Sequence, residues 1–350
     1  MLVYNVLFSV LSLAMLLAVL SKRSSKLYLV LALFALFVVA AFRDIDVGTD
    51  TRNYYLLFTY LDSLSNDRIY TGVQRGWYYV NYFFHRYFGY DFFMLFCYGV
   101  IYCGIASFIQ KYSKNSAISI WLWFTLYFFF SSMNIMRQYV AIGMVLLVIG
   151  KAVTQPKQFI CWVLLAATIH YSALICLSFL LFRYIRMNQK VIVLSAIASS
   201  FVVGLTMTYL VSDFLQNVMG YIGALGGGIG ESAESYIGGY SDGRNILTNA
   251  GVNIVVIATY LFSKDKNNQF LKMFVAYIVL NNLFGGLGQG NRMFLYFYIP
   301  AIVAIPNAYT EIRGPLAKMT YFILFVGFSV AVWIRSLDAN FSDVVPYAFR

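Results

Sequence analysis

The stretch "FICWVLLAATIHYSALICLSFLLF", Phe159 to Phe182, decides how this chain is folded. It is long enough to cross a lipid bilayer once, since a spanning helix needs about 20 mainly apolar residues. His170 lies at its centre, so the stretch can also enter the membrane and return as two short half-helices. A crossing and a return give opposite orientations to everything that follows.

The composition is that of an integral membrane protein. Of the 350 residues, 61% are hydrophobic and only 11% are charged, whereas soluble domains carry roughly 25% charged residues. Only helices and closed barrels satisfy the backbone within lipid, and these apolar runs lack the alternation of barrel strands. We therefore predict an all-α fold, a polytopic transmembrane helix bundle that forms a single membrane domain over residues 1–350.

About ten apolar runs are predicted to span the membrane, besides the stretch at 158–182. They lie at residues 3–20, 27–42, 91–110, 116–132, 134–150, 191–211, 246–263, 270–288, 293–309 and 316–334. We also expect an outer loop with interfacial helices at residues 43–90 and a flexible outer loop at residues 212–245. The four cysteines lie inside apolar runs with no zinc-site spacing, so we expect no disulfide framework and no metal.

The lysines favour the returning geometry for residues 158–182. If this stretch enters and comes back, all eleven lysines face the cytoplasm, as the positive-inside rule prefers. A single crossing would instead place five of them outside, together with Arg183 and Arg186. We therefore predict a re-entrant or short-helix hairpin at 158–182.

The arginines do not follow the lysines in this topology. Ten of the fourteen fall outside or at the outer boundary: Arg43, Arg52, Arg68, Arg75, Arg86, Arg137, Arg244, Arg292, Arg335 and Arg350. Arginine differs from lysine in its planar fork of donors, which holds phosphate or carboxylate in a bidentate manner. This asymmetry indicates an outer face that binds an anion, although single arginines at the interface also snorkel without binding anything.

Arg43, Arg137 and Arg292 are distinguished by their depth at the ends of apolar runs, where charges are costly and usually mark ligand sites or ion pairs. An internal pair such as Arg43 with Asp44 is the alternative. His170 would come near the outer side in the returning geometry, level with Arg137. Its imidazole could serve as a general base, or it could be a packing residue.

Four motifs, in order along the chain, resemble the EpsG-type branch of Wzy-like O-antigen and exopolysaccharide polymerases. They are "FRDIDVGTDTRNYYLLF" from Phe42, "NIMRQYVAIGMVLL" from Asn134, "LAATIHYSALI" from Leu165 and "QGNRMFLYFYIPAI" from Gln289. One departure is Gln74 in "VQRGWYY", where relatives often have Glu, so a mechanism that rests on that acid would not transfer.

The resemblance implies a membrane glycosyltransferase that polymerises undecaprenyl-pyrophosphate-linked oligosaccharides on the periplasmic or outer face of the bacterial inner membrane. We expect Arg137 and Arg292, with Arg43 in support, to bind pyrophosphate, and His170 or Asp50 to deprotonate the acceptor hydroxyl. Further expected substrate contacts are Arg52, Arg75, Arg244 and Trp77. No cofactor is expected, and a chain-length regulator protein is a possible partner.

Three other functions stay open at this stage. An O-antigen ligase would use the same donor with another acceptor. A flippase or transporter of lipid-linked oligosaccharides would need charges along the membrane midplane. The runs 191–211 and 246–263 carry none, and the run 316–334 carries only Lys318, near its start. A membrane acyltransferase would need its His and Arg on the inner side.

Overall fold

The computed structural model describes residues 1–21, 26–63, 74–206, 217, 246–285 and 292–350. Within these residues the only regular elements are helices, and an isolated antiparallel bridge joins Arg43 to Phe349. The predicted all-α bundle is therefore confirmed, with several apolar helices long enough to cross a membrane. The predicted outer loop at 212–245 lies almost wholly outside the described residues.

The helices follow the predicted apolar runs closely. In chain order they are α1 (Leu2–Ser21), α2 (Lys26–Ala41), α3 (Thr51–Thr59), η1 (Leu61–Ser63), α5 (Arg75–Tyr87), α6 (Tyr90–Tyr112), α7 (Ser116–Thr125), α8 (Phe128–Asn134), α9 (Met136–Val148), α10 (Lys151–Thr154), α11 (Pro156–Ile169), η2 (Tyr171–Arg183), α12 (Lys190–Thr206), α15 (Ile246–Phe262), α16 (Gln269–Phe284), α17 (Leu295–Tyr298), α18 (Ala301–Glu311) and α19 (Pro315–Asp338).

By length and composition, four helical segments among the described residues can each cross a membrane: α1, α6, α19 and the segment Arg292–Glu311. The pair α7 and α8 would add a fifth, and seven other apolar helices have 10–17 residues. The run expected at 116–132 is broken rather than continuous. Its two helices are bent by 52° around Tyr127, whose φ of 70° is left-handed.

Residues 158–182 form a hairpin, so the chain turns back instead of crossing the bundle once. The α-helix α11 ends at Ile169, a 3₁₀ helix η2 starts at Tyr171, and the two pack against each other, with His170 at the apex between them. The short helix α10 comes directly before the hairpin and contacts η2, the second helix of the hairpin. The predicted short-helix hairpin is confirmed.

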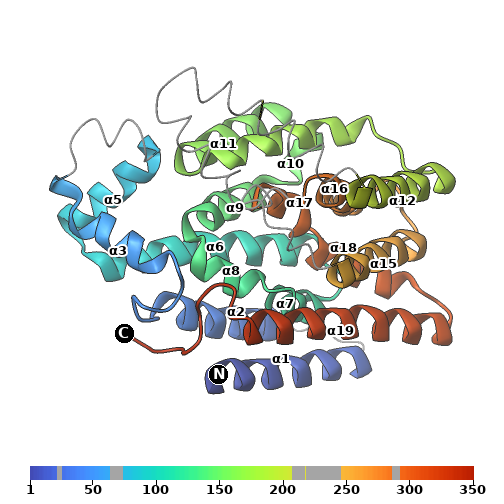
Figure 1. Cartoon of the computed structure of the whole chain (residues 1–350), viewed down its shortest axis with the longest axis horizontal. Helices are drawn as coiled ribbons and strands as arrows, with labels where there is room; N and C mark the ends of the chain where they lie inside the picture. Colours follow the sequence, from blue (N-terminus) through green and yellow to red (C-terminus); the bar gives the residue numbers. More distant parts are fainter. Residues whose placement is uncertain (22–25, 64–73, 207–216, 218–245, 286–291) are drawn as a thin grey trace.

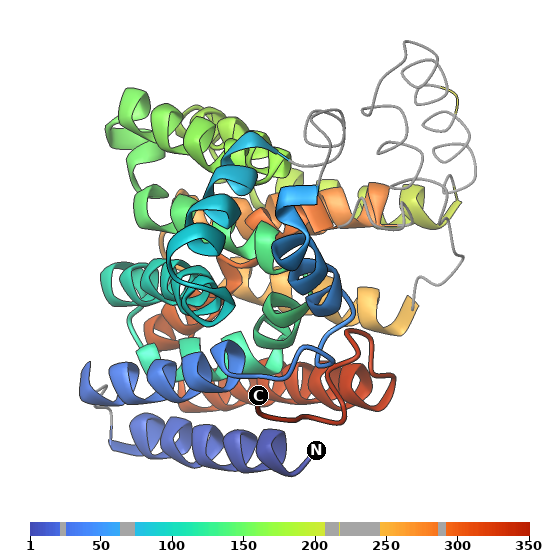
Figure 2. The same ribbon diagram turned by 90° about the vertical axis from the view of Figure 1, so that its left-hand side faces the viewer.

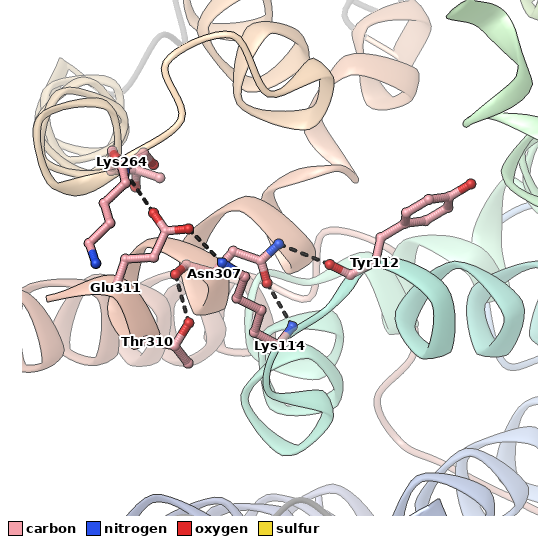
Figure 3. A network of polar contacts seen from close by, with 8 residues as sticks. Tyr112, Lys114, Lys264, Asn307, Thr310 and Glu311 are labelled. Carbon is pink, nitrogen blue, oxygen red and sulfur yellow. Dashed lines mark hydrogen bonds and ion pairs between the residues drawn. The ribbon is translucent and has the colours of Figure 1, made fainter. Parts of the chain in front are cut away.

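Lys114, Lys264 and Lys272 lie at one end of the bundle, which we call the lysine end. Here Glu311 of α18 accepts hydrogen bonds from Lys114 Nζ (2.6 Å) and the backbone N–H of Lys264 (2.7 Å). One turn earlier, Asn307 accepts from the N–H of Lys114 (2.7 Å) and donates to the carbonyl of Tyr112 (2.9 Å). Figure 3 shows how these two side chains tie the α6–α7 connection to α18, while Glu311 also reaches the α15–α16 connection.

The chain after the hairpin comes back to the same lysine end. Lys272 donates to the carbonyl of Phe182 (2.8 Å), and Asn267 hydrogen-bonds to both Met187 and Asn188. A return of residues 158–182 explains this meeting, since a single crossing would have separated residues 182–190 from Lys114 and Lys264 by the thickness of the bundle.

Both chain termini and the helices α3 and α5 lie at the opposite end of the bundle, which we call the arginine end (Figure 1). The view onto this end shows α3 and α5, in blue and cyan, lying across the ends of the longer helices (Figure 2). The helix α9, which starts here, packs on α6, α11 and η2. Its approach to α6 is close enough that a Cβ on Gly104 would come within 2.3 Å of the Gly143 carbonyl oxygen.

Candidate active site

The loop from Phe42 to Asp50 is fastened from the inside by Arg43. Its guanidinium is 0% exposed and donates to the carbonyls of Ala40 (2.5 Å), Val47 (3.1 Å) and Met133 (2.7 Å). It also donates to Thr51 Oγ1 (3.1 Å) and lies 5.1 Å from the ring centroid of Tyr98. All three guanidinium nitrogens therefore bind protein groups, and the prediction that Arg43 binds pyrophosphate is replaced by a structural role. Its partners are carbonyls and a hydroxyl, not Asp44.

The C-terminal tail fastens the same loop from the outside. The N–H of Asp44 donates to Ala348 (2.9 Å), and that of Gly48 donates to Asp343 (2.8 Å). Gly48 has φ +100°, and a Cβ there would lie 3.1 Å from the Met133 carbonyl oxygen, so the turn requires glycine. Asp50, which directly precedes α3, is thereby held at a fixed place on the arginine end.

Asp50 meets residues of the second and fourth motifs. Its carboxylate lies 4.0 Å from Arg292 Nη1, and its N–H donates to Asn134 Oδ1 (2.9 Å). Gln138 Nε2 in turn donates to the carbonyl of Arg292 (2.6 Å). The Asp50 and Arg292 side chains are 31% and 36% exposed, so this ion pair is partly open to solvent.

Arg137 reaches the same place from the N-terminus of α9. Its charge acts on the hydroxyl of Tyr54, one turn along α3 from Asp50, and on Asp50 itself. Arg137 Nε is buried and has no hydrogen-bond partner among the described residues. A buried guanidinium N–H without an acceptor is costly, so this atom identifies a position where a ligand oxygen would be favourable.

Burial and charge act in opposite directions on the acidic groups of α3. Burial raises the pKa of Asp50, and the positive charges of Arg292 and Arg137 partly oppose that rise. Burial also raises the pKa of Tyr54 to about 12, so that its hydroxyl stays protonated. A carboxyl whose pKa is raised toward neutrality is suited to accept a proton.

The charges of Arg137 and Arg292 both act on the ring of His170. Its Nδ1 contacts Ser172 Oγ (2.6 Å) and accepts a hydrogen bond from the N–H of Ser172 (3.3 Å), which caps the first turn of η2. Ser172 Oγ also lies 3.2 Å from the hydroxyl of buried Tyr296. The hairpin thus places its central histidine in the same cluster as Asp50.

The structure therefore brings together four of the predicted site residues: Asp50, Arg137, His170 and Arg292. We call these four the arginine-end cluster. They come from the loop before α3, the start of α9, the apex between α11 and η2, and the start of the α17–α18 segment. A cluster with two guanidinium groups can hold an anion with two or more phosphate oxygens, while its carboxyl group can accept a proton.

Two of the remaining predicted substrate contacts, Arg52 and Trp77, have partners outside this cluster. Arg52 is 66% exposed and pairs with Asp46 (3.2 Å), and Arg75 opens α5. Trp77 is 1% exposed and packs on Tyr54 and Phe93, so it is a core residue and not a free face for stacking on sugars. Arg244 lies outside the described residues.

Sequence reasoning missed the uncharged members that hold the cluster in place, namely Tyr54, Asn134, Gln138, Ser172 and Tyr296. Each lies within a few residues of a charged or histidine position in one of the four motifs. Their uncharged side chains carry no periodic or charge signal, so only the motifs themselves could have pointed to them. No group of three His, Cys, Asp or Glu side chains suited to a metal ion occurs in the described part of the chain.

Comparison with known proteins identifies the family of this chain. No curated protein and no solved structure matches the chain. A family model, that of the EpsG family, matches residues 26–349, which include all four members of the cluster. The chain therefore belongs to the EpsG family.

Proposed function

We propose that this protein is a polysaccharide polymerase, a membrane glycosyltransferase that joins oligosaccharide repeat units carried on undecaprenyl pyrophosphate. Membership of the EpsG family supports a polymerase function related to exopolysaccharide, and the apolar helices support a multi-pass membrane protein. The finer reaction and the substrate are our inference from the arginine-end cluster. The working face would be the periplasmic or outer side of the plasma membrane.

The reaction can be written with the residues of the cluster. The acceptor hydroxyl attacks the anomeric carbon of the donor glycan, the bond from that carbon to the diphosphate oxygen breaks, and the hydroxyl proton passes to Asp50. Arg137 and Arg292 stabilise the charge that develops on the departing diphosphate, which is the largest electrostatic demand of the step. The products are a longer lipid-linked glycan and free lipid diphosphate.

The observation that carries this proposal is the meeting of Arg137 and Arg292 around Asp50. Both charges act on this one carboxylate, although the two residues are far apart in sequence. Arg137 Nε is buried without an acceptor among the described residues, which favours an anionic ligand there. An ion pair that served stability alone would have no need of a second guanidinium with an unused donor.

The test is the length profile of surface polysaccharide in a deletion strain complemented with variants. Arg137→Gln or Arg292→Gln should abolish long chains while the protein still inserts at the wild-type level. Arg335→Gln is the matched control, because Arg335 is at the same end but binds Thr248 (3.0 Å) on α15. Normal chain lengths in both cluster variants would refute the assignment.

The deletion strain itself distinguishes a polymerase from a ligase. A polymerase deletion should leave single repeat units attached to the final acceptor, because ligation still occurs. A ligase deletion should leave no repeat attached at all. The second result would show that the cluster uses the same lipid diphosphate donor with a different acceptor.

A further inference from the structure

The side chains around His170 determine which of its ring nitrogens carries the proton. The backbone N–H of Ser172 can only donate, and it points at Nδ1. Nδ1 must therefore be the acceptor nitrogen, and in a neutral imidazole the proton then resides on Nε2. Protonation of Nδ1 would set two N–H groups against each other.

The neighbouring hydroxyls are consistent with this assignment and extend it. With Nδ1 as acceptor, Ser172 Oγ donates to it across 2.6 Å, and the hydroxyl of Tyr296 donates to Ser172 Oγ across 3.2 Å. The chain of donors runs from Tyr296 through Ser172 to His170, so that each hydroxyl hydrogen has one acceptor. Tyr296 is only 3% exposed, which keeps competing water away from it.

We propose that His170 is not the general base of this site but a neutral hydrogen-bond donor, whose Nε2–H binds a phosphate oxygen of the lipid diphosphate between Arg137 and Arg292. A base at this position would need an unprotonated Nε2, which the Ser172 contacts disfavour. An imidazolium would place a third positive charge beside two guanidinium groups. A neutral donor adds a hydrogen bond to the anion without that repulsion.

This proposal deepens the proposed function and rests on it for the identity of the ligand. It leaves Asp50 as the proton acceptor, since Asp50 is the carboxyl group among the four cluster residues. Ser172 and Tyr296 are positioning residues, because they act through the imidazole and do not touch the substrate. The proposal therefore replaces the expectation that His170 deprotonates the acceptor.

The first experiment compares two substitutions of His170 that distinguish a hydrogen-bond donor from a general base. A glutamine amide places an N–H close to where imidazole Nε2 lies but cannot accept a proton at neutral pH. Elongation would be measured in membranes with the lipid-linked repeat unit extracted from the deletion strain. We expect His170→Ala to lose about 100-fold in rate and His170→Gln to stay within about tenfold of the parent protein. Equal loss in both variants would overturn the proposal.

The matched control is the second histidine of the chain. His85 lies on α5, 3.4 Å from Asp62 and outside the cluster, and His85→Gln should leave elongation unchanged. The same substitution leaves a single histidine for nitrogen-15 NMR of the protein in lipid nanodiscs. We expect Nε2 in the protonated and Nδ1 in the unprotonated shift range. The reverse assignment would overturn the proposal whatever the activity of the protein.

Binding and positioning are read from the same spectra. Undecaprenyl diphosphate should shift the Nε2 resonance, undecaprenol should not, and inorganic diphosphate shows whether the headgroup alone is enough. Ser172→Ala keeps the backbone N–H that fixes the tautomer but removes the hydroxyl donor, so Nε2 should stay protonated while the Nδ1 resonance shifts. Ser172→Thr should restore the parent Nδ1 resonance, which a purely structural role for Ser172 would not produce. An Nε2 resonance that shifts with neither undecaprenyl diphosphate nor inorganic diphosphate would overturn the proposal. Absence of elongation by the parent protein, with the NMR results as expected, would refute the polymerase function alone.

Discussion

Arg43 and Arg137 are both arginines at the outer ends of apolar runs, yet the structure assigns them different work. Arg43→Ala should destabilise the fold, because the side chain makes four hydrogen bonds from a fully buried position. At a net value of about 1 kcal/mol for each bond, the loss is about 4 kcal/mol. Thr51 Oγ1 still donates to Val47 (2.8 Å) and approaches Met133 (3.4 Å), which brings the expected loss to about 3 kcal/mol.

The assay is unfolding of the purified protein in one detergent, followed by intrinsic fluorescence with increasing denaturant. Arg43→Lys should recover only part of the loss, since an ammonium has three donors and lacks the planar fork. Arg137→Gln is the contrast: its Nε has no partner in the described structure, so stability should change by less than about 1 kcal/mol while polymer length collapses. A stable Arg43→Ala protein that makes no long chains would refute this reasoning and return Arg43 to the site.

Three further outcomes follow from the structure. If Asp50 accepts the proton, the rate of elongation should fall as the pH drops through the raised pKa of Asp50. Arg292→Gln should move this fall in rate to higher pH, because the charge of Arg292 lowers the pKa of Asp50. A pH dependence of the residual activity that does not move in this variant would contradict the assignment. Asn282→Leu should cost about 1–2 kcal/mol of stability, because it removes side-chain hydrogen bonds to Asn253 (3.0 and 2.9 Å) and Ser200 (3.0 Å) that join α12, α15 and α16. Asn188→Ala at the surface is the control and should cost little. Trp77→Ala should lower stability by about 3–5 kcal/mol without altering the type of glycan made, and the exposed Tyr79→Ala is its control; altered glycan recognition with intact stability would restore Trp77 as a sugar contact.

The candidate site shows which parts of such a prediction sequence patterns support. Arg137, Arg292, His170 and Asp50 could be named because charges are rare in apolar runs, and each lies at the end or the middle of such a run. Arg43 has the same pattern, yet its side chain is buried and bonded to protein groups. Its partners are the carbonyls of Ala40, Val47 and Met133, and a backbone carbonyl has no residue type by which a sequence could reveal it.

The amino-acid sequence by itself determined that this is a membrane protein, that it is helical, and that the chain turns back at His170. Hydropathy depends only on which side chains a segment carries. The positions of the lysines decide on which side of the membrane each loop stays, so both signals can be read directly along the sequence. Only the tertiary structure decided that Arg43 is bonded to protein groups while Arg137 Nε has no partner among the described residues, and that Nδ1 of His170 meets the N–H of Ser172. Those outcomes depend on distances of a few ångströms between segments far apart in the chain, such as Ser172 with Tyr296 or Arg43 with Met133.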